Sequence, residues 1–537
     1  MAAPILQPLA SLAARLPAPG RTGFWLLLAL AIKASYFLIS LQQGYADKLP
    51  APIAICTGDC DRYVLPIDHL VEHGQYDPDF RMPGYGAAYM LFRAWLPQHR
   101  AMDALTLLQL LLDALATVLL ARCALRMTGS AAAHHLAFAL YGLASTISGF
   151  NPFILTESLC ASVMVMALYF LLAYLHDARP RDGVLAGALV TWAYFMRPIM
   201  LPLLLLVLFL LVRTAWRSTG GRWTAVLYVL PFLLAQGAWT LRNHAVHDRW
   251  FLMTRTKYYP GYTPGQMASW TLVGTFDDIA ARYFLPDVGW PNRQAPTLSF
   301  ADLPIPPEIL TPEVTMDSLV ALRTYGLVIE DPTADPDLRR QCDSLFKAKA
   351  DRYAASIRRH HPFIVHVRTP ARLAARHIFR SSGVYNLFLR PFGQLPPWAK
   401  ALKLSHMAVY LVALYGALGL LALAVIRRNT THLLLAGALA YGMLVHPVII
   451  GIGDVRYLYA FYPLIVLGAV LFYTALARRT GFTPAARRTG PPAPASAAPS
   501  PPPCPAGHRA PWPCRSLPCP QYRKARCGRN NPSPCSH

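Results

Sequence analysis

The sequence predicts an all-α, multi-pass membrane protein with about ten membrane-spanning helices and two long outer loops. Of its 537 residues, 54% are hydrophobic and only 14% are charged, whereas about a quarter of the residues in an ordinary soluble domain are charged. The mean hydropathy is +0.32. Apolar runs long enough to cross a bilayer also recur along most of the chain.

The candidate spans are, in order, 24–41, 103–121, 132–149, 154–175, 183–196, 199–212, 224–241, 404–426, 431–450 and 456–477. Lys and Arg gather in the cytoplasmic connections of membrane proteins, which gives the spans an orientation. Every basic cluster falls on one side if the N-terminus is cytoplasmic: Arg15 and Arg21, Arg122 and Arg126, Arg179 and Arg181, Arg213 to Arg222, Arg427 and Arg428, and Arg478 and Arg479. The same bias explains the net charge of +23 better than nucleic-acid binding does.

The region 183–212 admits two interpretations. A helix rises ~1.5 Å per residue, so a run of fourteen residues covers only ~21 Å of a ~30 Å hydrocarbon core. The region is therefore two short spans or one long helix kinked at Pro198. The positions of the flanking Arg clusters favour two spans. Ten spans place both termini in the cytoplasm.

Three parts are predicted along the chain. Residues 1–23 form a short cytoplasmic tail that is too Pro-rich for a signal peptide. Residues 24–480 form the membrane domain, with outer loops at 42–102 and 242–403; the second loop has helical patterns at 313–328 and 337–360 and an amphipathic, interfacial pattern at 361–380. Residues 481–537 are Pro-rich, and we expect a disordered cytoplasmic tail.

The tail carries five of the ten cysteines: Cys504, Cys514, Cys519, Cys527 and Cys535. Zinc binding there is conceivable, but no pair has the C-x2-C spacing of a usual site. We expect instead that this basic tail lies near anionic lipid.

Charged residues crowd into 56–86, directly after the first apolar run. No lipid-facing segment can carry them, so we expect a folded loop at the water interface. Elsewhere charges also gather at the outer ends of spans, whereas a transporter places ionisable groups near the bilayer midplane. An outer chamber of this kind suits an enzyme that acts on a lipid substrate.

Four short motifs stand at these outer ends. Asp59 precedes Tyr63 by four residues in GDCDRY; Arg81 begins RMPGYG, which contains Tyr85; Glu157 ends NPFILTE; and Arg456 and Tyr457 head the last span, before Pro463. In this order and topology they resemble the GT-C glycosyltransferases that use polyprenyl-phosphate sugars. Within that group, the chain is similar to the bacterial relatives of protein O-mannosyltransferases and of the lipid A aminoarabinose transferase. The resemblance covers roughly residues 20–477.

The resemblance implies a GT-C-like helix bundle in a bacterial inner membrane, with its active site on the periplasmic side. The reaction would move a sugar from a polyprenyl-phosphate donor to a hydroxyl or amine of a lipid, glycan or protein acceptor, with inversion. Asp59 would be the general base and Asp61 the reserve candidate, because the acid that directly follows the first in many relatives is replaced here by Cys60. Arg62, Arg81 and Arg456 would bind phosphate, and Tyr63, Tyr85, Glu157 and Tyr457 would contact substrate.

No metal or other cofactor is indicated, and a divalent metal stays open as an alternative. His69 and His73 stand four residues apart, a spacing that permits metal binding, but packing or surface exposure explains them more simply. Cys56 and Cys60 bracket Asp59; one helical turn would place their Cα atoms ~6 Å apart, within disulfide range. Two free thiols, or contacts elsewhere that involve Cys342, are the alternative.

Two other functions stay open. A non-catalytic carrier or flippase of polyprenyl lipids would need a polar path through the membrane. A structural assembly factor would leave the clustering of Asp59, Arg62 and Arg81 without an explanation.

Overall fold

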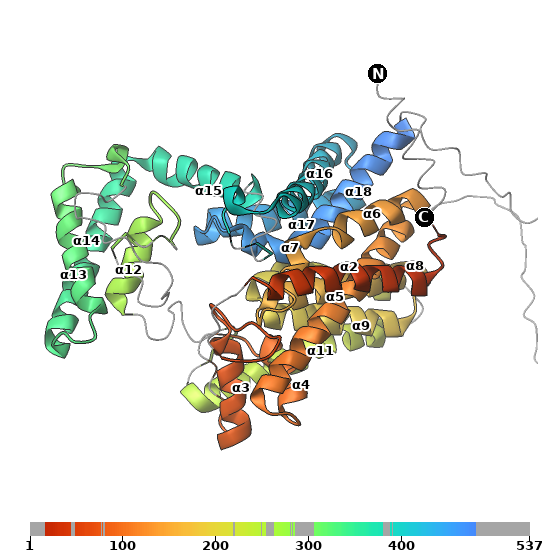
Figure 1. Ribbon diagram of the computed structural model, residues 1–537, viewed down its shortest axis with the longest axis horizontal. Helices are drawn as coiled ribbons and strands as arrows, with labels where there is room; N and C mark the ends of the chain where they lie inside the picture. The colour runs from red at the N-terminus through yellow and green to blue at the C-terminus, as the bar shows by residue number, and fades with distance from the viewer. Residues whose placement is uncertain are drawn as a thin grey trace, which may run out of the picture. The chain divides into compact units, whose positions relative to one another are not determined.

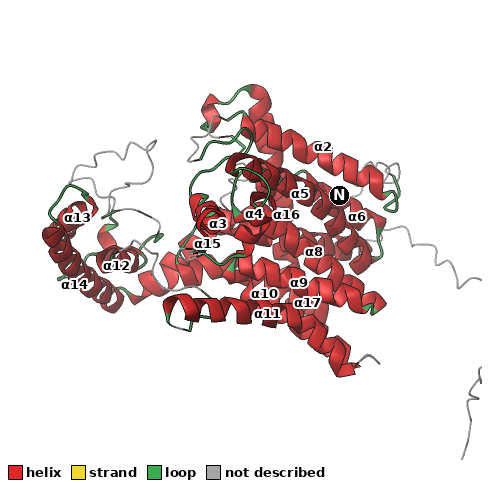
Figure 2. Ribbon diagram, turned by 90° about the horizontal axis from the view of Figure 1, so that it is seen from below, coloured by secondary structure: helices red, strands yellow, loops and turns green. Residues whose placement is uncertain are grey.

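The computed structural model describes residues 17–43, 49–76, 78, 81–217, 221–248, 250–253, 263–279, 281, 283–284, 305–379, 387–388 and 390–479 (Figure 1). In these ranges the regular elements are helices, and no β-strand is present (Figure 2). The prediction of an all-α chain is confirmed. The predicted tail 481–537, with its five cysteines, and residues 1–16 lie outside the described residues.

Eight helical segments in the described ranges are long and apolar enough to cross a membrane. They are α2 (Thr22–Leu41), α5 (Gln98–Thr128), α8 (Thr156–Asp177), α10 (Leu201–Arg217, after the 3-10 turn η1 at Pro198–Met200), α11 (Gly221–His247), α16 (Pro397–Arg427), α17 (Thr430–Leu444, which continues into the π-helix η6 at Val445–Ile450) and α18 (Tyr462–Arg479, preceded by the 3-10 helix η7 at Val455–Phe461). The protein is a multi-pass membrane protein.

Two of the ten predicted spans fall short of that length. The span predicted at 132–149 is divided into α6 (Ala131–Gly142) and α7 (Ser145–Ser148), because Ala144 is extended, with φ −77° and ψ 118°. The span predicted at 183–196 is α9 (Pro180–Met196), a helix of 17 residues. Their apolar composition alone did not reveal where each helix ends.

The region 183–212 contains two helices and not one kinked helix. Arg197 is extended, with φ −142° and ψ 104°, as steric conflict with a following proline favours. The chain therefore leaves α9 at Arg197 and begins α10 after Pro198, and the two helices pack against each other. The single kinked helix is therefore wrong, and two helices occupy the region, as the two-span interpretation expects; that both cross the membrane stays a prediction.

Helix α5 lies at the centre of the bundle, where it packs against α2, α6, α8 and α18 (Figure 1). Close approach of other helices depends on small residues. A Cβ at Gly416 of α16 would lie 2.7 Å from the Ala469 Cβ of α18, and one at Gly419 would lie 2.7 Å from the Phe472 ring. Small residues at such crossings favour helix association in lipid, where no hydrophobic driving force exists between helices.

Basic side chains join the helix ends that the orientation argument grouped together. Arg478 at the end of α18 donates to the Thr128 carbonyl at the end of α5 over 2.6 Å. Arg122 near the end of α5 donates to the Thr22 hydroxyl at the start of α2. The loop 56–86 follows the opposite end of α2, so the predicted orientation is consistent with the way these helix ends meet.

Outside the bundle, the first outer loop forms α3 (Asp61–His73) and α4 (Gly84–Arg93). The second forms α12 (Pro264–Val273), η3 (Pro307–Ile309), α13 (Met316–Glu330), α14 (Pro336–His360), the π-helix η4 (Ile364–Arg368), α15 (Thr369–Phe379) and η5 (Phe392–Gln394). Helices α12, α13 and α14 share a hydrophobic cluster of their own. The helices predicted at 313–328 and 337–360 are confirmed, and 362–379 is helical; the place of the predicted amphipathic segment at the membrane interface stays a prediction.

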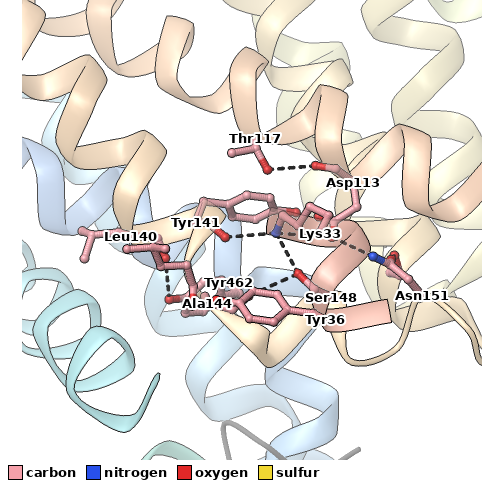
Figure 3. Close-up of polar contacts among 12 residues, drawn as sticks. Lys33, Tyr36, Asp113, Thr117, Leu140, Tyr141, Ala144, Ser148, Asn151 and Tyr462 are labelled. Atoms are coloured by element: carbon pink, nitrogen blue, oxygen red, sulfur yellow. Dashed lines mark hydrogen bonds and ion pairs between the residues drawn. The ribbon is translucent and has the colours of Figure 1, made fainter. Parts of the chain in front are cut away.

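Two charged residues lie near the middles of spans, contrary to the expectation that charges gather at the outer ends. Lys33 of α2 and Asp113 of α5 are fully buried and form an ion pair, with 3.3 Å between Lys33 Nζ and Asp113 Oδ2 (Figure 3). A single lysine inside the apolar run 24–41 barely changes the mean hydropathy of the run, so the sequence pattern concealed it. Pairing is the usual way in which such a group is accommodated.

Candidate active site

Hydrogen bonds attach the first outer loop to the helix bundle just before the acidic residues of the loop. The backbone of Ile55 bridges that of Phe153: Ile55 N donates to Pro152 O over 2.8 Å, and Ile154 N donates to Ile55 O over 3.0 Å. Asp103 at the start of α5 also accepts hydrogen bonds from two amides of the loop, at 3.0 and 2.9 Å. These bonds bring residues 56–60 beside the segment that leads into α8.

Asp59 lies in a closed turn that immediately precedes α3. Gly58 has φ +62°, a left-handed conformation that glycine adopts without a Cβ penalty. Cys56 and Cys60 form a disulfide with their Cα atoms 5.2 Å apart, so the predicted clamp around Asp59 is confirmed and the free-thiol alternative is wrong. Cys342, the other proposed partner, is a buried free thiol.

Arg81 reaches Asp59 because α4 packs very closely on the end of α9. A Cβ at Gly84 would lie 2.4 Å from the backbone of Phe195 and Met196, so only glycine fits there. This contact places the start of α4 next to Arg197. Arg81 Nη2 then lies 2.8 Å from Asp59 Oδ2, and its guanidinium covers the Tyr63 ring at 5.1 Å from the centroid.

Two further guanidinium groups approach Asp59 from other parts of the chain. Arg62 Nη1 is 3.9 Å from Asp59 Oδ1, and Arg456 Nη2 is 3.7 Å from Asp59 Oδ2. Arg456 is the second residue of η7, where Asp454 caps the helix by accepting from the Arg456 amide over 2.9 Å. Residues almost 400 positions apart in the sequence therefore meet at one carboxylate, as the motifs predicted.

Glu157 is a second, deeper carboxylate in the same cluster, with only 2% of its side chain exposed. Its Oε1 lies 3.3 Å from Arg456 Nε and 2.7 Å from Arg197 Nη2. Arg197 also donates from Nε to the Thr156 hydroxyl over 2.8 Å. The sequence motifs did not assign Arg197 to the site. The only sequence feature that marked it was its position as a cation between an apolar helix and Pro198.

The aromatic residues line the cluster. Tyr457 lies beneath Arg456, 5.1 Å from the guanidinium to the ring centroid, and stacks on His446 with 4.7 Å between centroids. Tyr63 packs on Tyr85 with 4.9 Å between centroids. Tyr85 is fully buried, and its hydroxyl donates to Gln109 over 3.1 Å. Tyr63 and Tyr457 thus contact the guanidinium groups directly, whereas Tyr85 supports them from behind.

The remaining candidates lie along α3. Asp61 begins the helix, and its carboxylate accepts from the Arg62 amide over 3.0 Å. His69 and His73 stack with 4.6 Å between ring centroids. Within the ranges that the structure describes, no three His, Cys, Asp or Glu side chains come close enough together to hold a metal ion.

The electrostatics of the site favour an ionised Asp59. Burial alone would raise the pKa of this carboxyl, but the charges of Arg81, Arg456 and Arg62 outweigh it and hold the pKa below its usual value. Burial raises the pKa of the Tyr63 phenol, which therefore stays protonated at neutral pH. Four guanidinium groups face two carboxylates in the cluster, a formal surplus of two positive charges.

That arrangement can bind an anion and accept a proton at the same place. The side chains of Asp59, Arg62 and Arg81 are 26–29% exposed, so a ligand can reach them from the solvent side. Guanidinium forks bind phosphate through paired N–H groups. The carboxylate among them is ionised and can take a proton from a neighbouring group.

No protein-family model matches the chain, and no curated protein matches it either. Among solved structures, the chain is similar to the crystal structure of ArnT from Cupriavidus metallidurans in the apo state. The two share 15% sequence identity with a TM-score of 0.32, and the match covers 85% of this chain and 78% of that chain. A superposition this loose carries no argument about the present chain.

Proposed function

We propose that the protein is a membrane glycosyltransferase that moves a sugar from a polyprenyl-phosphate donor to an acceptor hydroxyl or amine, with inversion at the anomeric carbon. The observation that carries the proposal is the position of Asp59. An ionised carboxylate stands among three guanidinium groups, at the end of a bundle of membrane helices and within reach of solvent.

The reaction assigns a separate task to each kind of group. The acceptor oxygen or nitrogen attacks the anomeric carbon and gives its proton to Asp59. The bond between that carbon and the phosphate oxygen breaks, and the phosphate leaves with the bonding electrons. Arg81 and Arg456 hold the leaving phosphate, and Arg62 adds a third positive charge nearby. These cations supply the charge that the leaving group requires, so the proposed reaction needs no metal or other cofactor.

Donor binding would also prepare the base. In the free protein Arg81 lies 2.8 Å from Asp59, which lowers the pKa of the carboxyl and makes it a weak base. A donor phosphate competes for the same guanidinium. As the phosphate draws Arg81 away, the pKa of Asp59 rises towards its ordinary value, and the base becomes stronger once the donor is bound.

Glu157 has the geometry of an orienting group. Its Oε1 binds Arg197 and Arg456, whereas its Oε2 is buried without a hydrogen-bond partner among the described residues. Because Arg456 contacts both carboxylates, Glu157 fixes the guanidinium that also reaches Asp59. A sugar hydroxyl that enters the site would satisfy the second oxygen.

A cavity of about 490 Å³ supports a lipid-linked donor. It is lined by residues of α4, α9 and α11, and its lining includes Pro83 and Gly84, two to three residues after Arg81. Its wall is largely apolar and aromatic, and includes Trp192 and Trp239. A prenyl chain in this cavity would leave its phosphate close to the guanidinium cluster. The positive-inside pattern supports an extracytoplasmic position for this end of the bundle, which in our proposal is the periplasmic face of a bacterial inner membrane.

Lipid and glycan profiling of a deletion strain tests the proposal. We expect a polyprenyl-phosphate sugar to accumulate and one envelope lipid, glycan or protein to lose a sugar. The wild-type gene should reverse both changes, and a gene encoding Asp59→Asn should reverse neither. Purified enzyme should keep its turnover in excess EDTA. An unchanged lipid and glycan profile in the deletion strain would reject the transferase.

The buried Lys33–Asp113 pair is the observation that favours the alternative function, a carrier for the same lipids, because transporters place charges at the midplane. Both side chains are nevertheless fully buried and paired. Liposomes separate the two functions: a carrier moves a labelled polyprenyl-phosphate sugar across the bilayer without an acceptor, whereas the transferase requires an acceptor and consumes the donor.

A further inference from the structure

The Lys33–Asp113 pair lies at the centre of a polar network inside the bundle (Figure 3). Lys33 Nζ donates to the Tyr141 carbonyl over 3.1 Å and to the Ser148 hydroxyl over 2.8 Å. Asp113 Oδ2 accepts from Asn151 Nδ2 over 3.0 Å. Lys33 of α2 and Asp113 of α5 therefore bind three residues of the segment 141–151, which precedes Glu157 in the chain.

Asn151 links this network to the active site along two routes. Its Oδ1 accepts from the Ser158 hydroxyl, on the residue that follows Glu157 in the first turn of α8. Its carbonyl accepts from Gln109 Nε2 over 2.9 Å. The other end of the Gln109 amide accepts from the Tyr85 hydroxyl, and Tyr85 packs against Tyr63 below Arg81.

A contribution to stability does not account for the pair. Burying two charges in the middle of a bundle carries a desolvation penalty that their attraction only roughly offsets. The pair and its partners do, however, favour one conformation of the 141–158 segment, the one in which their buried polar groups are hydrogen-bonded. Asn151 can satisfy Asp113, Gln109 and Ser158 together only in that arrangement.

We propose that Lys33 and Asp113 are positioning residues of the active site. Through Asn151 they fix the start of α8, so that Glu157 faces Arg197 and Arg456. Through Gln109 they fix Tyr85 and the aromatic support of Arg81. The part of this proposal that concerns turnover rests on the proposed function, whereas the coupling between the ion pair and Glu157 does not.

A thermal double-mutant cycle tests the coupling without any substrate. The double variant Lys33→Met with Asp113→Leu replaces the pair by apolar side chains, which buried ion pairs often tolerate. In detergent, Glu157→Gln should lower the Tm of the otherwise wild-type protein. We expect the same substitution to lower the Tm by less than half as much in the apolar-pair background, because Glu157 no longer faces its cations there. Equal shifts in the two backgrounds would overturn the proposal.

Two companion variants make the cycle specific. Thr117→Val is the control: it removes a buried hydrogen bond to the Asp113 carbonyl one turn along α5 but leaves the network to Asn151 intact. Glu157→Gln should have its full effect in that background. If the apolar-pair variant fails to insert, Asn151→Ala provides the same cycle with the ion pair retained, and additive shifts there would likewise refute the coupling.

Steady-state kinetics then separate positioning from a loss of folded protein. On monodisperse protein, we expect Asn151→Ala and the apolar-pair variant to raise the KM for a polyprenyl-phosphate sugar by at least ~10-fold, because small misplacements in a site are costly. A purely structural role would lower the amount of enzyme but leave the KM of the surviving fraction unchanged. If wild-type protein turns over no polyprenyl-phosphate sugar at all, the proposed function fails, and the thermal cycle still decides the coupling.

Discussion

Replacing Asp59 by Asn should change donor binding and turnover in opposite directions. Asn keeps the size of the side chain and one hydrogen-bond acceptor, but it carries no negative charge and takes no proton. The cluster of four guanidinium groups then faces one carboxylate instead of two. The attraction for a phosphate therefore increases while the base is lost.

The structure sets the scale of both effects. The Asp59–Arg81 pair is close, at 2.8 Å, but its side chains are 29% and 26% exposed, and exposed pairs contribute up to ~1 kcal/mol. Releasing Arg81 from that competition should tighten the binding of a polyprenyl monophosphate by up to ~5-fold. Loss of a positioned general base should lower kcat by ~10²–10⁴-fold.

Two measurements on the same detergent preparation check this pair of effects. Native mass spectrometry with undecaprenyl monophosphate gives the binding constant, and turnover of a polyprenyl-phosphate sugar gives kcat. Asp61→Asn is the matched control, since Asp61 lies two residues on, at the start of α3. It should leave both values within ~2-fold of wild type, as is usual for a substitution near the surface.

Particular results would refute the assignment. Weaker phosphate binding by Asp59→Asn would mean that Asp59 does not compete for the guanidinium groups. Retained turnover would make Asp59 a structural cap. If Asp61→Asn abolishes turnover and Asp59→Asn does not, the base has been misassigned by two positions.

Other predictions concern the surroundings of the site. Glu157→Gln leaves Arg197 and Arg456 without their buried counter-charge and should destabilise the protein by about 3 kcal/mol in chemical unfolding; an unchanged midpoint would contradict the buried pairs. Non-reduced peptide mass spectrometry should find Cys56 linked to Cys60, and alkylation of both without reductant would remove the clamp. Because the charges of Arg81, Arg456 and Arg62 hold the pKa of Asp59 below its usual value, the base stays ionised in mildly acidic solution, and kcat/KM should show no loss from this group between pH 7 and 5. The acid limb of kcat should lie at higher pH than that of kcat/KM, and coincident limbs would disprove donor-induced release. Reporter fusions after residues 45, 126, 300 and 480 should read outside, inside, outside and inside, and a cytoplasmic reading after 300 would overturn the topology.

The helices and most site residues could be predicted from local patterns. Apolar runs identify buried or lipid-facing helices. The short motifs identified side chains that the structure joins in one series of contacts, each shorter than 4 Å: Arg81 to Asp59, Asp59 to Arg456 and Arg456 to Glu157. Such motifs are readable because each places a costly charged group at a helix end.

What the sequence concealed depends on contacts between distant segments. Arg197 becomes part of the site because α9 packs on α8, which brings its guanidinium to Glu157. Lys33 and Asp113 are each single charges in long apolar runs, and only the packing of α2 on α5 pairs them. The break between α6 and α7 at Ala144 likewise has no composition signal.

Because Arg456 lies late in the sequence, the site is completed late in the synthesis of the chain. Membrane helices enter the bilayer one after another as the chain is synthesised, and this guanidinium lies in η7, directly before the final described helix, α18. The segments that carry Asp59, Arg81 and Glu157 all precede it in the chain and are synthesised first. Until then the two carboxylates lack the cation that joins them. A chain arrested before residue 456 therefore carries Asp59, Arg81 and Glu157 but lacks the guanidinium that contacts both carboxylates.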